Sequence, residues 1–123
     1  MYEVMITAGF AAAHRLRDYG GKCENIHGHN FRVDVYARAK ELDVVGLTID
    51  FRILKDKTQT FLDQLDHKYL NELPHFVETN PSSENIAAYI FKNLTKELNN
   101  ENVMITKVSV WESDASCASY YEE

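Results

Sequence analysis

The feature that most constrains the fold is an alternating segment, FRVDVYARA, at residues 31–39. Phe31, Val33, Val35 and Ala37 fall on one face, and Arg32, Asp34, Tyr36 and Arg38 fall on the other. Because successive side chains of a strand point to opposite faces, this pattern predicts a strand with one buried face. A chain of 123 residues has room for one modest core, so we expect residues 1–123 to form a single domain.

Two later segments have the spacing of amphipathic helices. The first covers roughly residues 51–65, with Asp50 as its cap, and its apolar side consists of Leu54, Phe61, Leu62 and Leu65. The second runs to about residue 98, with Asn80 or Ser82 as its cap and Pro81 suited to its first turn. Its apolar stripe consists of Ile86, Tyr89, Ile90, Leu94 and Leu98. The connection between the helices is long and irregular, which in small domains often indicates function.

Three further segments are strand-like, at residues 2–13, 103–112 and 117–122. In the second of these, period-two alternation puts Met104, Val108, Val110 and Glu112 on one face. The order β-β-α-α-β-β predicts an α+β fold, a four-stranded antiparallel sheet with two helices on one face. The two edge strands would be open, and such edges are often covered by a partner subunit.

Charge and composition exclude several classes of protein. The net charge is −6 and no run of Lys and Arg occurs, so we expect no nucleic-acid partner. Residues 4–13 are apolar but follow Glu3 and no basic residue, which is wrong for a secretory signal, and they are too few to span a bilayer. We therefore expect a cytoplasmic protein without membrane contacts. Cys23 and Cys117 are then most simply reduced thiols.

Three histidines are placed to meet at one end of the sheet. His27 and His29 flank Gly28, and in an extended chain residues two apart point to the same side. His14 ends the first strand, so a hairpin between the first two strands would bring it beside them. Three neutral imidazoles with an open fourth position are typical of catalytic zinc. The same set would also accept copper, nickel or cobalt.

Cys23 precedes these histidines in a glycine-containing loop. It is a fourth metal ligand, a nearby base or nucleophile, or a spectator, and its place in a glycine-rich loop argues against simple core packing. A cation nearby would lower the pKa of its thiol. Cys117 has no such neighbours in the sequence, and we interpret it as a spectator.

Asp66 and Glu112 can each be interpreted in two ways. Asp66 and His67 form either an acid–base pair or a polar helix end, and adjacent residues do not generally face each other. Glu112 extends an apolar face beside Trp111. It is either solvated beyond the end of the strand or partnered by a donor pair such as the N–H and amino groups of a purine- or pterin-like ring.

Together these residues resemble the 6-pyruvoyl-tetrahydropterin synthase family, and within it the bacterial 6-carboxy-5,6,7,8-tetrahydropterin synthases. The resemblance covers nearly the whole chain and depends on the order and spacing of six motifs. They are FAAAHRL (10–16), CENIHGH (23–29), IDF (49–51), LDHKYLN (65–71), NPSSENIA (80–87) and VWES (110–113). The tail after Glu112 departs from the glycine-containing ending that is familiar in the family.

The resemblance implies the tunnelling fold (T-fold), assembled as a homohexamer from two trimers with active sites at subunit interfaces. It implies one Zn²⁺ per subunit, a catalytic cysteine, a catalytic Asp–His pair and a glutamate that anchors the pterin. The corresponding residues are His14, His27 and His29 for the metal, Cys23, Asp66 and His67 for catalysis, and Glu112, Ser82 and Ser83 for the pterin. Arg15 and Lys22 are our candidates for binding the triphosphate, the alternative being plain surface charge.

The branch is indicated by the three residues between Cys23 and the His-Gly-His motif, since the pyruvoyl-forming enzymes carry a longer insert. The expected function is a zinc-dependent lyase of queuosine biosynthesis that converts 7,8-dihydroneopterin triphosphate to 6-carboxy-5,6,7,8-tetrahydropterin, acetaldehyde and triphosphate. One alternative is 6-pyruvoyl-tetrahydropterin synthesis from the same substrate. Another is a non-catalytic zinc-binding module, in which Cys23 would complete the metal shell. A dihydroneopterin aldolase or epimerase and a generic zinc hydrolase are further rivals, the latter without an H-E-x-x-H helix in its favour.

Overall fold

The alternating segment lies at the centre of a five-stranded sheet in the computed structural model, which describes residues 1–21 and 25–123. It forms most of β2 (His27–Ala39), which pairs with β1 (Tyr2–His14) and with β4 (Val103–Ser113). The full order is β3-β1-β2-β4-β5, with β3 at Lys68–Tyr69 and β5 at Ser116–Tyr120. The four long strands are antiparallel, as predicted, and the two-residue β3 adds a parallel edge that the sequence pattern did not indicate.

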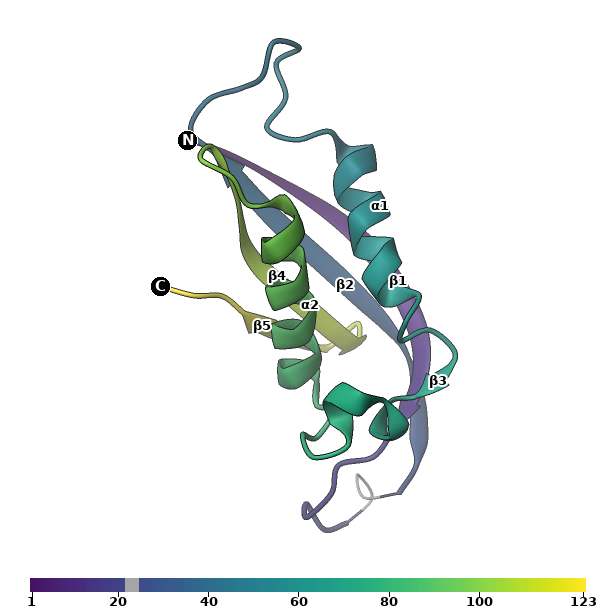
Figure 1. The fold of residues 1–123 in the computed structure, drawn as a ribbon. Coiled ribbons are helices and arrows are strands. Elements are labelled where there is room, and N and C mark those ends of the chain that lie inside the picture. The colour runs from purple at the N-terminus through teal and green to yellow at the C-terminus, as the bar shows by residue number, and fades with distance from the viewer. Residues whose placement is uncertain (22–24) are drawn as a thin grey trace.

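Both helices lie on one face of this sheet, as expected (Figure 1). Helix α1 (Phe51–Leu62) begins where the Asp50 side chain accepts a hydrogen bond from the Arg52 amide, and it ends three residues earlier than predicted. Helix α2 (Ser83–Leu98) is capped by Ser82, whose hydroxyl accepts from the Asn85 amide at 3.1 Å. Of the two predicted caps Ser82 is therefore the one used. Pro81 lies before the cap and not in the first turn as predicted.

The core fills the space between the helices and the inner face of the sheet. Phe31, Val33, Val35 and Ala37 are all buried, and so are most residues of both predicted helix stripes, the partly buried exceptions being Phe61, Tyr89 and Leu98. At the end of the sheet nearest the histidines, the rings of Phe10 and Phe31 stack with centroids 4.8 Å apart. Phe31 therefore forms an apolar floor beneath the candidate metal ligands.

The predicted face of β4 is wrong at its beginning. The β2–β4 register slips between Tyr36 and Ala37, so that Thr106 is an extra residue, and a bulge of this kind reverses the alternation before it. Val103 and Ile105 are consequently buried, whereas Met104 is 55% exposed. From Val108 onward the predicted face is correct.

The connection between the helices contains β3 and two short 3₁₀ helices, Leu70–Glu72 and Pro74–Phe76. Its far end is held by Arg17, whose guanidinium donates to the carbonyl oxygens of Phe76 and Val77. Within the described ranges, no helix has the length and apolar character that a membrane span requires.

Candidate metal and substrate site

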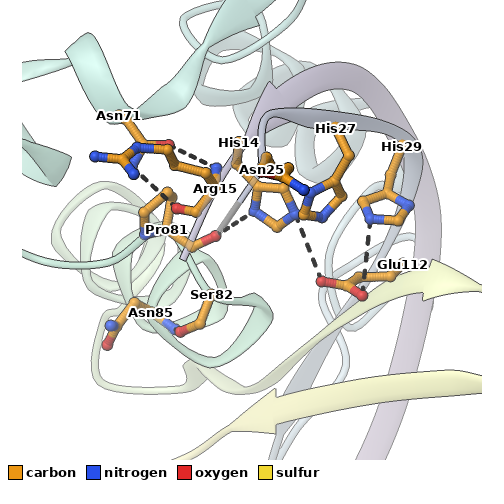
Figure 2. A network of polar contacts seen from close by, with 10 residues as sticks. All are labelled: His14, Arg15, Asn25, His27, His29, Asn71, Pro81, Ser82, Asn85 and Glu112. Atoms are coloured by element: carbon orange, nitrogen blue, oxygen red, sulfur yellow. Dashed lines mark hydrogen bonds and ion pairs between the residues drawn. The ribbon is translucent and has the colours of Figure 1, made fainter. Parts of the chain in front are cut away.

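The hairpin register brings the three histidines together. His14 is the cross-strand partner of His27, and Ala12 is the partner of His29, so all three imidazoles lie on the helix-covered face. One ring nitrogen from each lies within 4.8 Å of the others, close enough for a single metal ion (Figure 2). The predicted proximity of His14, His27 and His29 is thus what the structure shows.

Backbone carbonyls orient two of these rings. The Nδ1 of His14 lies 2.7 Å from the Pro81 carbonyl oxygen, and the Nδ1 of His27 lies 2.8 Å from that of Asn25. When Nδ1 donates to a carbonyl, the proton is on Nδ1 and the lone pair of Nε2 is free for a metal. Burial lowers the pKa of His14, although its bond to Pro81 opposes the shift, so its neutral, metal-binding form is favoured at neutral pH.

Buried nitrogens without partners provide a test of whether the site fits a metal. The Nε2 atoms of His14 and His29 are buried and have no hydrogen-bond partner among the described residues. A buried polar atom left in this way costs about 1–3 kcal/mol unless something occupies it. A zinc ion would satisfy both nitrogens, and a donor set of three imidazoles suits Zn²⁺. The residues therefore fit the metal that the sequence predicts.

Glu112 lies against this histidine group and not in free solvent. Its two carboxylate oxygens lie 3.8 Å from His14 Nε2 and 3.9 Å from His29 Nε2 (Figure 2). The β4–β5 register shifts between Trp111 and Ser113, which leaves Glu112 without a cross-strand partner. Of the two interpretations of Glu112, the structure excludes the one in which the strand has already ended.

Asp66 and His67 form a close pair within one chain. His67 Nδ1 lies 2.9 Å from Asp66 Oδ2, and the other carboxylate oxygen accepts from the Ala11 amide at 2.8 Å. The Ala11 amide and then the His67 ring hold the pKa of the Asp66 carboxyl below its ordinary value, so it is ionised at neutral pH. The expectation that adjacent residues would not face each other is wrong here, because His67 adopts a left-handed backbone with φ of 58°.

Two hollows lie at this end of the sheet. One, of about 550 Å³, is lined by His29 and His67 together with Ala11–Ala13 and their neighbours on β2 and β3. The other, of about 190 Å³, is lined by Ser83, Glu112 and Cys117 among others. Glu112 lines the smaller hollow, and one of its carboxylate oxygens lies 3.9 Å from His29 Nε2. A ligand in the smaller hollow would therefore lie close to the candidate metal position.

The two predicted serines have different surroundings. The Ser82 hydroxyl caps α2 through the Asn85 amide. The Ser83 hydroxyl is buried, has no hydrogen-bond partner among the described residues and lines the smaller hollow beside Glu112. Ser83 is therefore the better placed of the two to bind a ligand.

The remaining candidate residues are the two predicted triphosphate ligands and the two cysteines. Lys22 and Cys23 lie outside the described residues. The Arg15 guanidinium pairs with no carboxylate in the described part of the protein, and only the backbone of Arg15 is fixed. Cys117 is an exposed free thiol, and nothing in the sequence indicated that it shares a hollow with Glu112.

Two asparagines that the sequence patterns did not single out hold the backbone after His14. Asn71 accepts from the Arg15 amide at 2.9 Å and donates to its carbonyl at 3.0 Å, and Asn80 does the same for Arg17 at 3.0 Å in both directions. Each side chain thus makes the two backbone hydrogen bonds that a neighbouring strand would otherwise make, at residues that follow the end of β1. A signal for them was present, since both lie in motifs quoted above, LDHKYLN and NPSSENIA.

Comparisons with known proteins agree on one family. Residues 3–123 match the family described as 6-pyruvoyl tetrahydropterin synthase. A 6-carboxy-5,6,7,8-tetrahydropterin synthase of Synechocystis is 37% identical over 99 residues, covering 76% of this chain and 75% of the relative. A putative 6-pyruvoyl tetrahydrobiopterin synthase of Caenorhabditis elegans is 33% identical over 124 residues, covering 90% and 88%.

A solved structure of a Caenorhabditis elegans 6-pyruvoyl tetrahydropterin synthase has the same fold. It superposes with a TM-score of 0.87 at 29% identity, over 99% of this chain and 96% of that protein. Nearly the whole chain therefore shares its architecture with that protein.

Proposed function

Because the chain belongs to the 6-pyruvoyl tetrahydropterin synthase family, we propose that it is a zinc-dependent lyase acting on 7,8-dihydroneopterin triphosphate. With the consumption of one water molecule, the proposed products are 6-carboxy-5,6,7,8-tetrahydropterin, acetaldehyde and triphosphate. The observation that carries the proposal is the group His14, His27 and His29, with its ligand atoms within 4.8 Å of one another and Glu112 beside it.

His14, His27 and His29 would hold the zinc ion. When bound, zinc supplies Lewis-acid polarisation of hydroxyl oxygens on the substrate side chain. The apolar floor formed by Phe31, whose ring centroid lies 5.5 Å from that of His14 and 5.4 Å from that of His29, limits water near these ligands. A drier surrounding strengthens every charge interaction made there.

Glu112 and Ser83 would bind the pterin ring. The ring presents an N–H and an amino group side by side, and one ionised carboxylate can accept from both. The Ser83 hydroxyl is unpaired among the described residues in the same hollow and can add one further hydrogen bond. Ser82 would support this arrangement only indirectly, by capping the helix that carries Ser83.

Cys23, Asp66 and His67 would move protons. We assign to the Cys23 thiolate the removal of a proton from a substrate carbon next to a polarised hydroxyl, and to the Asp66–His67 pair the proton transfers on the other face. The Asp66 carboxylate fixes which nitrogen of His67 carries the proton and stabilises the ring when it is protonated. Arg15 and Lys22 would bind the triphosphate, which leaves by elimination.

We also propose a pathway, a compartment and an assembly for this protein. 6-Carboxy-5,6,7,8-tetrahydropterin would feed queuosine biosynthesis in the cytoplasm. The proposed assembly is a homohexamer of two trimers with active sites at subunit interfaces. The open edges of the sheet at β3 and β5 are compatible with such edge-to-edge contacts.

A second candidate, 6-pyruvoyl-tetrahydropterin synthesis, is favoured by one observation: relatives named for either product match at similar identity, 37% and 33%. Both reactions use every residue named above, so the product decides. Zinc-loaded protein is incubated with 7,8-dihydroneopterin triphosphate, and pterins and aldehydes are identified by mass spectrometry. 6-Carboxy-tetrahydropterin with acetaldehyde supports the first proposal, and 6-pyruvoyl-tetrahydropterin replaces it with the second. No turnover by a zinc-bound protein would favour a non-catalytic zinc module.

A further inference from the structure

Asp34 is a buried carboxylate to which the proposed reaction gives no role. It is 6% exposed and lies on the face of the sheet opposite the helices, since its neighbours on β2, Val33 and Val35, point into the core. Its Oδ1 accepts from the Thr7 hydroxyl at 2.8 Å, and its Oδ2 accepts from the Trp111 indole N–H at 3.0 Å. These two bonds offset part of the cost of burying the charge, and they tie β2 to both neighbouring strands.

Arg32 holds the Trp111 ring on the same face of the sheet. Its guanidinium carbon lies 4.3 Å from the ring centroid, and its Nε lies 3.7 Å from Asp34 Oδ1. A guanidinium over the face of an indole is attracted by the electrons of the ring, and the indole N–H is bound at the same time. The side chain of Trp111 is therefore fixed by two partners on β2.

Trp111 is also the last residue of β4 that is anchored to β2 before Glu112. The pairing of β2 with β4 ends at Arg32 and Trp111, and the pairing of β4 with β5 omits Glu112 between Trp111 and Ser113. Glu112 thus has no cross-strand partner on either side, yet its carboxylate lies at the smaller hollow and beside the histidine group. The direction of this carboxylate therefore depends on how firmly the adjoining residues are held.

We propose that Asp34 is a positioning residue for ring binding: by holding Trp111, it keeps the end of β4 in the course that directs Glu112 to the smaller hollow. This role rests on the proposed function, in which Glu112 binds the pterin ring. Asp34 itself lies on the other face of the sheet and does not line the hollow. Loss of its bond to Trp111 should weaken ring binding in the ground state and the transition state alike, which raises KM and leaves kcat nearly unchanged.

Steady-state kinetics of four variants separate positioning from stability. Trp111→Phe keeps an aromatic ring but removes the N–H, and Asp34→Ala removes its acceptor. Thr7→Val is the matched control, because it removes the other hydrogen bond of Asp34 and leaves the bond to Trp111 in place. We expect the first two variants to raise KM at least about fivefold with kcat within about twofold, and the control to change neither by more than about twofold. Asp34→Asn can still accept from the indole N–H, so its KM should stay within about twofold of wild type.

Two further readouts follow the bond to Trp111 and its effect on Glu112. Trp111 is the only tryptophan of the chain, so Asp34→Ala should shift the fluorescence emission more than Thr7→Val does. Calorimetry with 7,8-dihydropterin, which carries the ring without a side chain, measures ring binding apart from turnover. Asp34→Ala should weaken this binding at least about fivefold in wild-type protein, but less than about twofold in Glu112→Ala protein, where the carboxylate to be positioned is already absent.

The possible results distinguish this role from the proposed function. Wild-type KM in Trp111→Phe, or equal effects of Thr7→Val and Asp34→Ala on KM or on emission, would overturn the positioning role alone. An undiminished effect of Asp34→Ala on ring binding in the Glu112→Ala background would do the same. A zinc-loaded wild type that binds no 7,8-dihydropterin would overturn the proposed function and this role with it.

Discussion

Asp66 and His67 are neighbours in sequence and also hydrogen-bonding partners, with 2.9 Å between Oδ2 and Nδ1. A left-handed backbone at His67 turns its ring back toward the preceding carboxylate. That conformation is uncommon for a residue other than glycine, and contacts to β1 hold it in place. The His67 amide donates to the Ala11 carbonyl at 2.6 Å, and the Ala11 amide donates to Asp66 at 2.8 Å. The same strand that ends at His14 thus positions the proposed proton-transfer pair.

Replacing Asp66 with Asn should reduce kcat while leaving the fold and the metal content intact. The amide oxygen of Asn can still accept from the Ala11 amide, but it no longer stabilises a protonated His67 ring. Positioned acid–base groups contribute about 10²–10⁴-fold, so we expect kcat to fall by at least about tenfold. Asp56→Asn, which changes an exposed carboxylate on α1, is the matched control. Equal kcat for the Asp66 variant and this control would remove the pair from the mechanism.

Replacing Ser82 and Ser83 with Ala should separate stability from binding. Ser82→Ala removes the cap of α2 and should cost about 0.5–2 kcal/mol in the free energy of unfolding, with little change in KM. Ser83→Ala removes a hydroxyl that makes no hydrogen bond among the described residues, so it should change stability less. It should raise KM about 2–10-fold if that hydroxyl binds the pterin. Urea unfolding and steady-state kinetics of both variants measure the two effects, and the reverse pattern would contradict the assignment.

Removing the Cys23 thiol should abolish turnover and spare the metal. Cys23→Ala is expected to keep one zinc per subunit, because the proposed ligands are histidines, while losing the base that removes the C–H proton. Cys117→Ala, the other single-cysteine change, should retain both zinc and turnover. Metal analysis and product formation are measured on the same preparations. A zinc-replete, active Cys23 variant would refute its role as the base.

Acid should destabilise the metal-free protein partly through His14. Burial lowers the pKa of His14 below its ordinary value of 6.5, so the unfolded protein takes up this proton before the folded protein does. The stabilising contribution is complete above pH 6.5 and is lost as the pH falls through the folded-state pKa. Urea unfolding of metal-free wild type and His14→Asn between about pH 5 and pH 7.5 tests this. Stability should fall more steeply toward acid in wild type, and parallel curves would contradict the assignment.

Much of the fold was predictable because the spacing of apolar residues and the capping of helices depend on residues close together in the sequence. The alternation in residues 31–39 and the stripes of the two helices depend on side chains a few positions apart, and the hairpin then fixes His14 opposite His27. The exposure of Met104 was missed because Val103, Met104 and Ile105 are all apolar, so the residue types alone did not show which face each would take before the one-residue bulge at Thr106.

The sequence predicted which residues lie in the site better than it predicted which of them contact one another. Histidine spacing indicated a metal, but the contact of Asp66 with His67 depends on one backbone angle that the residue types do not determine. The contact of Glu112 with His14 and His29 depends on three strands meeting in space. The roles of Asn71 and Asn80 arise only where β1 has ended and its backbone lacks a neighbouring strand.

The most direct test of the proposed function is triphosphate release, which both candidate reactions share. Protein stripped of metal, the same protein reloaded with Zn²⁺ and the Cys23→Ala variant are each incubated with 7,8-dihydroneopterin triphosphate. Inorganic triphosphate is then quantified by ion chromatography. We predict rapid release only from the reloaded wild type, and at least about 100-fold less from the other two. Absence of release by the zinc-loaded protein, or equal release with and without metal, would contradict the assignment of this histidine group to pterin triphosphate chemistry.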